Sequence, residues 1–296
     1  MEPLTDFVTL FRGRGDVYGH EEGRCVKETL SLDVFNTHLY GDQPIGTYPM
    51  VPHKGKYYVA WGCCDIDYES YVDARKIQDA LAVVHITSWI ERSRSKGYHV
   101  WVFATGLVPA SDMRRVLLLA HQVADVPARE VNPKQETLGF GQYGNYVRLP
   151  YPKSHADTGR RVVLKDEQTH YELAEFVQLA MESRPSPELL ASIAQLWKEP
   201  ERHTAVIDYG TEPTTREALA NLSPLGKVIW RDGPLEGRDR SSTLTKLAHE
   251  CVRSGLDPSS TKVVIVSADK RWGKYHLRPN GEYEIDKLVV RVYSNV

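Results

Sequence analysis

Cysteine and long hydrophobic runs are scarce in this sequence. The four cysteines, Cys25, Cys63, Cys64 and Cys251, form no Cys-x-x-Cys pair, which argues against a zinc site and a disulfide framework and indicates a reducing compartment. No apolar run approaches the ~20 residues that span a bilayer, and the N-terminus has no signal-peptide core. We therefore expect a cytoplasmic protein that does not contact a membrane.

An excess of charge of one sign is also missing. The 37 Lys and Arg residues nearly balance the 39 Asp and Glu residues, and the formal net charge is −2. Contact with nucleic acid would therefore need a local basic patch. The 296 residues suit one large domain or two ordinary ones, and the 41% hydrophobic content is typical of globular proteins.

The apolar patterns predict an α+β domain followed by a helical one. We expect short strands and loops over residues 1–55, strands at 57–67, 99–104 and 162–164, and helices at 73–92 and 111–124. Beyond about residue 170 the pattern is mostly helical, most clearly at 241–255. The run 261–268 fits a strand or a buried helix equally well. We place the domains at 1–184 and 185–296.

In the stretch WGCCDIDYES, residues 61–70, two aspartates stand at the end of a predicted buried strand. Because side chains alternate across a strand, Asp65 and Asp67 share one face while Ile66 points into the core. Two neighbouring carboxylates repel each other unless a cation lies between them, and their oxygens suit Mg²⁺ or Mn²⁺. A solvated turn is the alternative for this pair taken alone.

A polar turn before the next strand supplies groups that bind phosphate. Ser93, Ser95 and Lys96 offer hydroxyls and a positive charge, and Gly97 lets the backbone approach a triphosphate closely. His99 begins the following strand and is within reach of the same phosphates. A serine-rich turn with a structural histidine is the alternative.

Three later segments add candidates to the same site. Asp166 ends a strand in RRVVLKD and would be a third carboxylate for two metal ions. The segments EVNPKQ and GNYVRLP carry Lys134, Asn145 and Arg148, which suit contacts to phosphate, ribose or base. Surface positions in turns and strands explain each of them equally well when taken singly.

Taken together, these segments resemble the archaeo-eukaryotic primase superfamily, the primase-polymerases. That family has an acidic pair on a strand, a Ser-x-Gly-x-His type segment that opens the next strand, and a later strand that ends in an acidic residue. The sequence matches them with residues 65–67, 95–99 and Asp166. SRSKGYHV is also similar to a segment of bacterial end-joining polymerases, although Arg94 stands where glycine is usual there. The wider pattern resembles the primases of phages and mobile elements.

The resemblance implies a fold, an activity and ligands. It implies a primase-polymerase core followed by a small helical domain, and primer synthesis and extension on single-stranded DNA with two divalent metal ions. Asp65, Asp67 and Asp166 would be the catalytic metal ligands. The nucleoside triphosphate would be bound by Ser93, Ser95, Lys96, Gly97 and His99, with Lys134, Asn145 and Arg148, and a helicase is a common partner.

Basic residues supply candidate template contacts. Arg92, Arg94, Arg160 and Arg161, and more weakly Arg12 and Arg14, would touch DNA phosphates, so that binding weakens steeply with salt. Weaker candidates for the initiating nucleotide lie in the helical part. These are Arg238, Arg240, Lys270, Arg271 and Lys274.

Several alternative functions remain open at this point. A repair polymerase that only extends primers, or a defence-associated relative, would share every catalytic residue. A non-catalytic nucleic-acid-binding module of a replication complex belongs to another class. A nucleotide-sugar transferase would explain the paired aspartates but not SKGYH followed by GNYVRLP.

Overall fold

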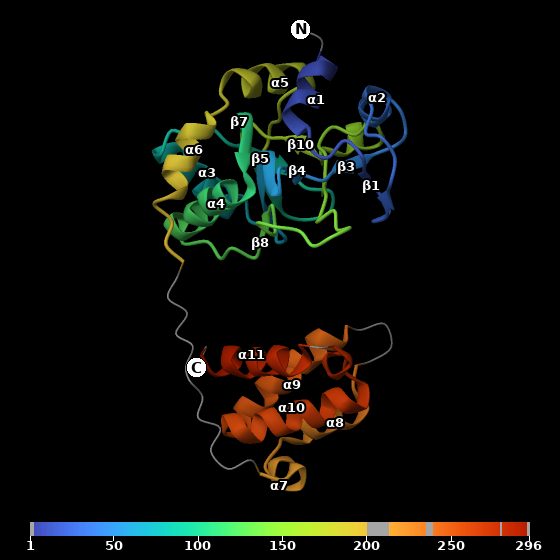
Figure 1. The fold of residues 1–296 in the computed structure, drawn as a ribbon, viewed down its shortest axis with the longest axis vertical. Coiled ribbons are helices and arrows are strands. Elements are labelled where there is room, and N and C mark those ends of the chain that lie inside the picture. The colour runs from blue at the N-terminus through green and yellow to red at the C-terminus, as the bar shows by residue number, and fades with distance from the viewer. Residues whose placement is uncertain (1–2, 200–212, 235–238, 279, 295–296) are drawn as a thin grey trace. The chain divides into compact units, whose positions relative to one another are not determined.

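The chain forms two compact units, Met1–Glu199 and Pro200–Val296. The computed structural model describes residues 3–199, 213–234, 239–278 and 280–294 (Figure 1). The predicted boundary at 184/185 falls too early. Helix α6 (Pro187–Ala194) belongs to the first unit because Leu190 and Ala194 are buried in that unit's core.

The first unit contains two antiparallel sheets. In the larger sheet the strand order is β10-β6-β7-β5-β4, and β8 pairs with β5 beside β4. Its strands are β4 (Val51–His53), β5 (Lys56–Ile66), β6 (Trp89–Arg92), β7 (Tyr98–Pro109), β8 (Glu130–Asn132) and β10 (Val162–Val163). The smaller sheet has the order β2-β1-β3-β9, from β1 (Tyr18–His20), β2 (Cys25–Val26), β3 (Ile45–Thr47) and β9 (Val147–Arg148).

The two faces of the larger sheet bury different side chains because residues alternate along β5 and β7. Cys64 and Val100 face a core shared with α3 (Tyr71–Val83), α4 (Ala110–Ala124) and α6. Trp61 and Trp101 face an aromatic core shared with α1 (Pro3–Phe11), α2 (Leu32–Tyr40) and α5 (Leu173–Glu182). The smaller sheet adds Ile45 and Val147 to this aromatic core, so it lies on the same side of the larger sheet.

The second unit is helical in the residues that the structure describes. Its helices are α7 (Thr215–Ala220), α8 (Pro224–Asp232), α9 (Arg240–Arg253), α10 (Pro258–Trp272) and α11 (Gly281–Tyr293). Asp239 and Asp257 cap α9 and α10 by accepting bonds from backbone N–H groups, and proline at the first position favours the starts of α8 and α10. The ambiguous run 261–268 is therefore helix, and its Val264 and Ile265 are buried in this unit's own core.

The α+β class and the helical second part are confirmed, and two local predictions are wrong. Only the first part of 73–92 is helix: Ile86 N–H closes the end of α3 on the Leu81 carbonyl, His85 takes a left-handed φ of 60°, and β6 follows. Residues 1–55 contain α1 and α2, which are only 9 residues each and stand among glycines and prolines. Among the described residues, no helix is long and apolar enough to cross a membrane.

Candidate active site

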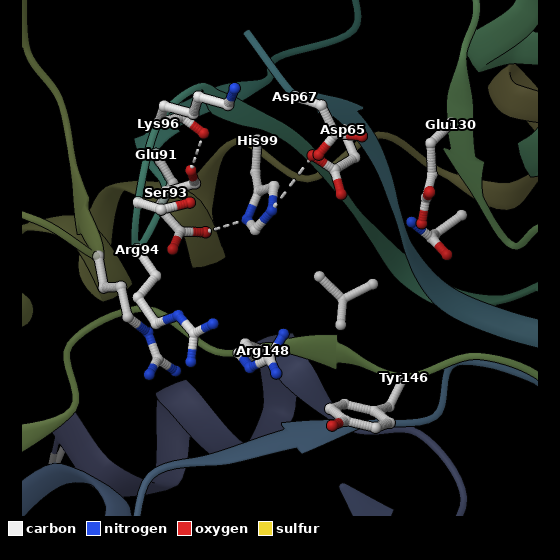
Figure 2. A pocket seen from close by; sticks show the side chains of 14 residues that line it. Asp65, Asp67, Glu91, Ser93, Arg94, Lys96, His99, Glu130, Tyr146 and Arg148 are labelled. Atoms are coloured by element: carbon white, nitrogen blue, oxygen red, sulfur yellow. Dashed lines mark hydrogen bonds and ion pairs between the residues drawn. The ribbon is translucent and has the colours of Figure 1, made fainter. Parts of the chain in front are cut away.

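A polar pocket in the first unit lies between the two sheets. Its lining includes Asp65 and His99 of the larger sheet and Arg148 of the smaller one, together with Tyr146 just before β9. Figure 2 shows the carboxylates of Asp65, Asp67 and Glu130 on the side opposite Arg148 and Tyr146. The pocket therefore presents negative groups on one wall and a cation on the facing wall.

The acidic wall is a row of side chains at one level of the larger sheet: Glu91 on β6, His99 on β7, Asp65 on β5 and Glu130 on β8. Each is the direct cross-strand partner of the next. Directly opposed residues share a face and have Cβ atoms about 4.5–5.5 Å apart. Asp67 follows the end of β5, and Ile66 between the two aspartates is buried in the core, as predicted.

His99 is held between two carboxylates. Its Nδ1 lies 2.8 Å from Glu91 Oε2, which also accepts the indole N–H of Trp101 at 2.7 Å, and its Nε2 lies 3.7 Å from Asp65 Oδ1. Burial by itself would lower the pKa of His99, but the charges of Glu91 and Asp65 outweigh it and raise this pKa to about 9. At neutral pH the ring is an imidazolium whose Nε2–H points toward the pocket.

The carboxylates of this wall suit a divalent cation. Burial raises the pKa of Asp65, and repulsion from Asp67, Glu130 and Glu91 raises it further, against the opposing effect of His99. A hard cation would relieve this repulsion, and carboxylates are its preferred ligands. Among the described residues, no three His, Cys, Asp or Glu side chains already form a metal-binding group, so an ion would have to draw these oxygens together.

The turn between β6 and β7 forms the next part of the wall. Ser93 is buried, its hydroxyl donates to the Lys96 carbonyl at 2.8 Å, and its N–H bonds the Gly97 carbonyl at 3.1 Å. Ser95 and Lys96 are exposed and line the pocket. Gly97 has a φ of 94°, and a Cβ there would clash with the Ile66 carbonyl oxygen, so only glycine lets this turn lie against the end of β5.

Three arginines, Arg94 of the β6–β7 turn, Arg148 of β9 and Arg161 just before β10, gather around the carboxylate of Glu21. Glu21 binds Arg94 at 2.9 Å and Arg161 at 2.8 Å, its side chain lies 3.8 Å from Arg148 Nε, and its carbonyl accepts from Arg148 Nη2 at 2.9 Å. Burial would raise the pKa of Glu21, but the arginines outweigh it and lower this pKa. One negative charge thus faces three positive ones, which leaves an excess suited to a polyphosphate.

Asp166 does not join the paired aspartates, contrary to the prediction. It lies in an exposed turn after β10, where its carboxylate accepts from the N–H groups of Gln168 and Thr169 and from the Thr169 hydroxyl. Strand β10 is separated from β5 by β6 and β7, whereas β8 is the direct neighbour of β5. Glu130 on β8 is therefore the third carboxylate of the pocket.

Two further predicted residues do not line the pocket. Asn145 is exposed next to Tyr146. Lys134 reaches the site only through Glu130, with its Nζ 2.6 Å from the Glu130 carboxylate. The Lys134 ammonium therefore neutralises the Glu130 carboxylate in this structure, and a metal ion that binds Glu130 would compete with it.

The candidate DNA contacts fall into different settings. Arg161 is 1% exposed and bonded to Glu21, so it is a wall of the pocket and not a surface contact. Arg92 donates to the Glu167 carbonyl and Arg14 pairs with Asp16. Arg12 and Arg160 are not among the residues that line the pocket. The remaining candidates belong to the second unit.

Most of the second-unit candidates have local partners. Arg240 donates to the Gly273 carbonyl, Lys274 Nζ lies 3.7 Å from Asp239, and Arg271 stacks on Trp230 with its guanidinium carbon 4.6 Å from the ring centroid. Lys270 is an exposed residue at the end of α10. Arg238 lies outside the described residues.

Sequence reasoning missed Glu21, Glu91, Glu130, Asn132 and Tyr146, all of which line or brace the pocket. Glu130 had a usable signal because it opens the same EVNPKQ segment that supplied Lys134. Glu91 had no usable signal in the sequence, because the apolar pattern predicts one helix over residues 73–92, and Glu91 falls within it. Glu21 lies in a turn of the first 55 residues and meets its arginines only in the fold.

Comparison with known proteins places the chain in a family. The family model described as the archaeo-eukaryotic primase domain of the TOTE conflict system matches residues 20–188, more than half of the chain, and this range contains every pocket residue named above. No curated protein matches. The solved primase RepB′ is 12% identical over 98% of this chain and 94% of that chain, with a TM-score of 0.28, which is too low to establish a shared arrangement.

The family match confirms the resemblance that the acidic pair and the Ser-Lys-Gly-Tyr-His segment indicated. The chain belongs to the archaeo-eukaryotic primase domain family of TOTE conflict systems.

Proposed function

We propose that this chain is a DNA primase-polymerase, a nucleotidyltransferase that makes primers on single-stranded DNA and extends them. The observation that carries the proposal is the pocket itself. A row of carboxylates and an imidazolium faces a group of arginines, and the paired acidic and cationic walls suit a metal-bound triphosphate. The family match supports the same reaction class.

In the proposed reaction a 3′-hydroxyl oxygen attacks the α-phosphorus of a nucleoside triphosphate, the bond to pyrophosphate breaks, and the hydroxyl proton is lost. Asp65, Asp67 and Glu130 would hold one or two Mg²⁺ or Mn²⁺ ions. These ions would supply neutralisation of the triphosphate and activation of the hydroxyl.

The phosphates would meet cations and N–H donors from both sheets. His99 presents its Nε2–H, Lys96 adds a flexible ammonium, and Arg148 faces them from β9. Glu91 keeps the His99 ring oriented by accepting from Nδ1, and Glu21 holds the three arginine side chains together at the pocket. These prearranged charges stabilise negative charge as it develops on the leaving pyrophosphate.

The first experiment is synthesis on an unprimed single-stranded DNA template with Mg²⁺ or Mn²⁺ and labelled NTPs or dNTPs. The folded double variant Asp65→Ala/Asp67→Ala is the control. New oligonucleotides from the wild type alone support a primase and show which sugar starts the chain. Extension of a primer without unprimed synthesis would favour a repair-type polymerase. Folded protein that is inactive in both assays would overturn the proposal in favour of a nucleic-acid-binding module.

A defence role is a second candidate, and the name of the matching family favours it over the phage replication type. In that case the same cytoplasmic activity would act on the nucleic acid of an invading element, with a helicase as a partner. Phage challenge of cells that carry the wild-type chain or the double variant tests this role. Equal plating on both would count against it.

A further inference from the structure

The pocket has one aromatic residue that the proposed chemistry does not use. Tyr146 stands directly before β9, next to Val147. Among the pocket-lining residues that the structure describes, Tyr146 brings the one benzene-type ring and Val147 the one aliphatic side chain, while the others are acidic, basic, serine, asparagine or histidine residues. Phosphates and a metal ion need the charged groups, so the Tyr146–Val147 step is the only apolar surface left for another part of the substrate.

The Tyr146 ring is fixed from behind by two glycines. A Cβ at Gly19 of β1 or at Gly46 of β3 would run into the ring, so the ring lies directly on the backbone of both strands. Its hydroxyl donates to the His20 carbonyl at 2.9 Å. Tyr48 adds a second ring whose centroid is 5.4 Å away at 56°. These contacts hold the ring in one orientation before any ligand arrives.

The ring is also placed at the correct end of the pocket. Figure 2 shows Lys96 and Arg94 toward one end, with Tyr146 at the other end below Glu130. Arg148 connects the two ends. Its guanidinium carbon is 5.8 Å from the Tyr146 ring centroid, and its Nη2 donates to the backbone carbonyl of Glu21, around which the three arginines gather. A nucleotide with its phosphates among the cations would extend its nucleoside toward Tyr146.

We infer that Tyr146, supported by Gly19 and Gly46, is the platform on which the nucleoside of the bound triphosphate stacks. This inference rests on the proposed function and adds the subsite for the base and sugar. A preoriented ring binds a base with little entropic cost, and aromatic stacking accepts every base because each has a π-face. The platform therefore contributes nucleotide affinity without selecting among the bases.

The test separates the nucleoside from its phosphates. Binding of ATP, of CTP and of inorganic tripolyphosphate, each with Mg²⁺, is measured for the wild type and for Tyr146→Leu, with KM and kcat for nucleotide incorporation. We expect Tyr146→Leu to weaken ATP and CTP binding by about tenfold, in line with base–aromatic stacking, while tripolyphosphate affinity stays unchanged. KM should rise by a similar factor with little change in kcat.

Two control variants guard against loss of the fold. Tyr146→Phe keeps the ring and should bind ATP within about threefold of the wild type, because it loses only one hydrogen bond to a backbone carbonyl. Tyr143→Leu removes a neighbouring ring of the same aromatic group that does not line the pocket, and it should bind normally. A loss in Tyr143→Leu equal to that in Tyr146→Leu would overturn the inference.

The remaining outcomes are also decisive. Unchanged ATP affinity in Tyr146→Leu overturns the platform while the proposed function stands, provided that the wild type binds ATP. Reduced affinity for single-stranded DNA with normal ATP affinity assigns the ring to the template and likewise overturns the inference. A folded wild type that binds neither nucleotide nor tripolyphosphate overturns the proposed function, and the platform with it.

Discussion

At the scale of single residues, we expect the carboxylate of Glu130 to be required for activity and that of Asp166 to be dispensable. Glu130 sits beside Asp65 in the pocket wall, whereas Asp166 caps an exposed turn. We expect Glu130→Gln to lower nucleotide incorporation at least about a hundredfold at unchanged fold, since charge stabilisation of this kind supplies such factors. Asp166→Asn should retain activity. Reversed effects in a primer-extension assay would restore the motif assignment made from sequence.

Glu91 is a positioning residue that acts through His99. One of its oxygens accepts from both His99 and Trp101, and the other has no hydrogen-bond partner within the described residues. Glu91→Gln keeps an oxygen acceptor but removes the charge, and Glu91→Ala removes both. We expect incorporation to fall in Glu91→Gln and further in Glu91→Ala, with KM for the nucleotide rising in both. Equal activity in all three proteins would show that the carboxylate only fills space.

At the scale of elements, the turn between β6 and β7 depends on Gly97. Gly97 and Gly23 have nearly equal φ values of 94° and 93°, but only at Gly97 would a Cβ meet the backbone, at the carbonyl of Ile66. Gly23→Ala should cost about 1 kcal/mol of unfolding free energy from left-handed strain alone. Gly97→Ala should cost at least about 3 kcal/mol and weaken nucleotide binding. Denaturant unfolding of the two variants checks the difference, and similar losses would contradict it.

His38 of α2 links strand β3 and the loop after β9 from inside the aromatic core. Its Nδ1 accepts from the Ile45 N–H of β3 at 3.1 Å, and its Nε2–H donates to the Pro150 carbonyl at 2.8 Å. This arrangement needs a neutral ring, and burial lowers the pKa of His38 from 6.5 to about 3. Below pH 6.5 His38 is therefore protonated in the unfolded chain but stays neutral in the folded protein, so stability falls as the pH decreases.

Between pH 6.5 and about 5, this single group should cost about 2 kcal/mol of unfolding free energy. The raised pKa of His99 adds only a small opposing slope there, because the folded ring is already protonated and the unfolded ring completes its protonation just below pH 6.5. His38→Gln should be less stable at pH 7 but lose less stability on acidification. Denaturant unfolding at several pH values measures both slopes, and parallel slopes would exclude His38 as the cause.

At the scale of the whole molecule, the two units have separate cores. Among the residues that the structure describes, the two cores of the first unit extend no further than Ala194, and the core of the second unit begins at Ala218. A fragment of residues 1–199 should therefore unfold cooperatively, within about 2 °C of the corresponding transition in the full chain, and bind ATP with the same affinity. An unfolded or non-binding fragment would show that the second unit completes the first.

The sequence determined those features that depend on neighbouring residues. The buried strand that ends at Ile66, the glycine turn before β7, and helix α9 follow from alternation, glycine geometry and helical periodicity within a few positions. The acidic pair and the Ser-Lys-Gly-Tyr-His segment were therefore readable, and they indicated the family.

Only the tertiary structure decided which distant residues share the pocket. Glu130 lies on the short strand β8 and Asp166 follows the short strand β10, and the order of those strands in the sheet places Glu130, not Asp166, beside Asp65. Glu21 meets Arg148 and Arg161 across 127 and 140 residues of chain, and the Tyr146 hydroxyl meets the His20 carbonyl across 126. Strand pairing and sheet packing are long-range contacts that local periodicity does not encode, which is why the sequence indicated the chemistry but misplaced its third carboxylate.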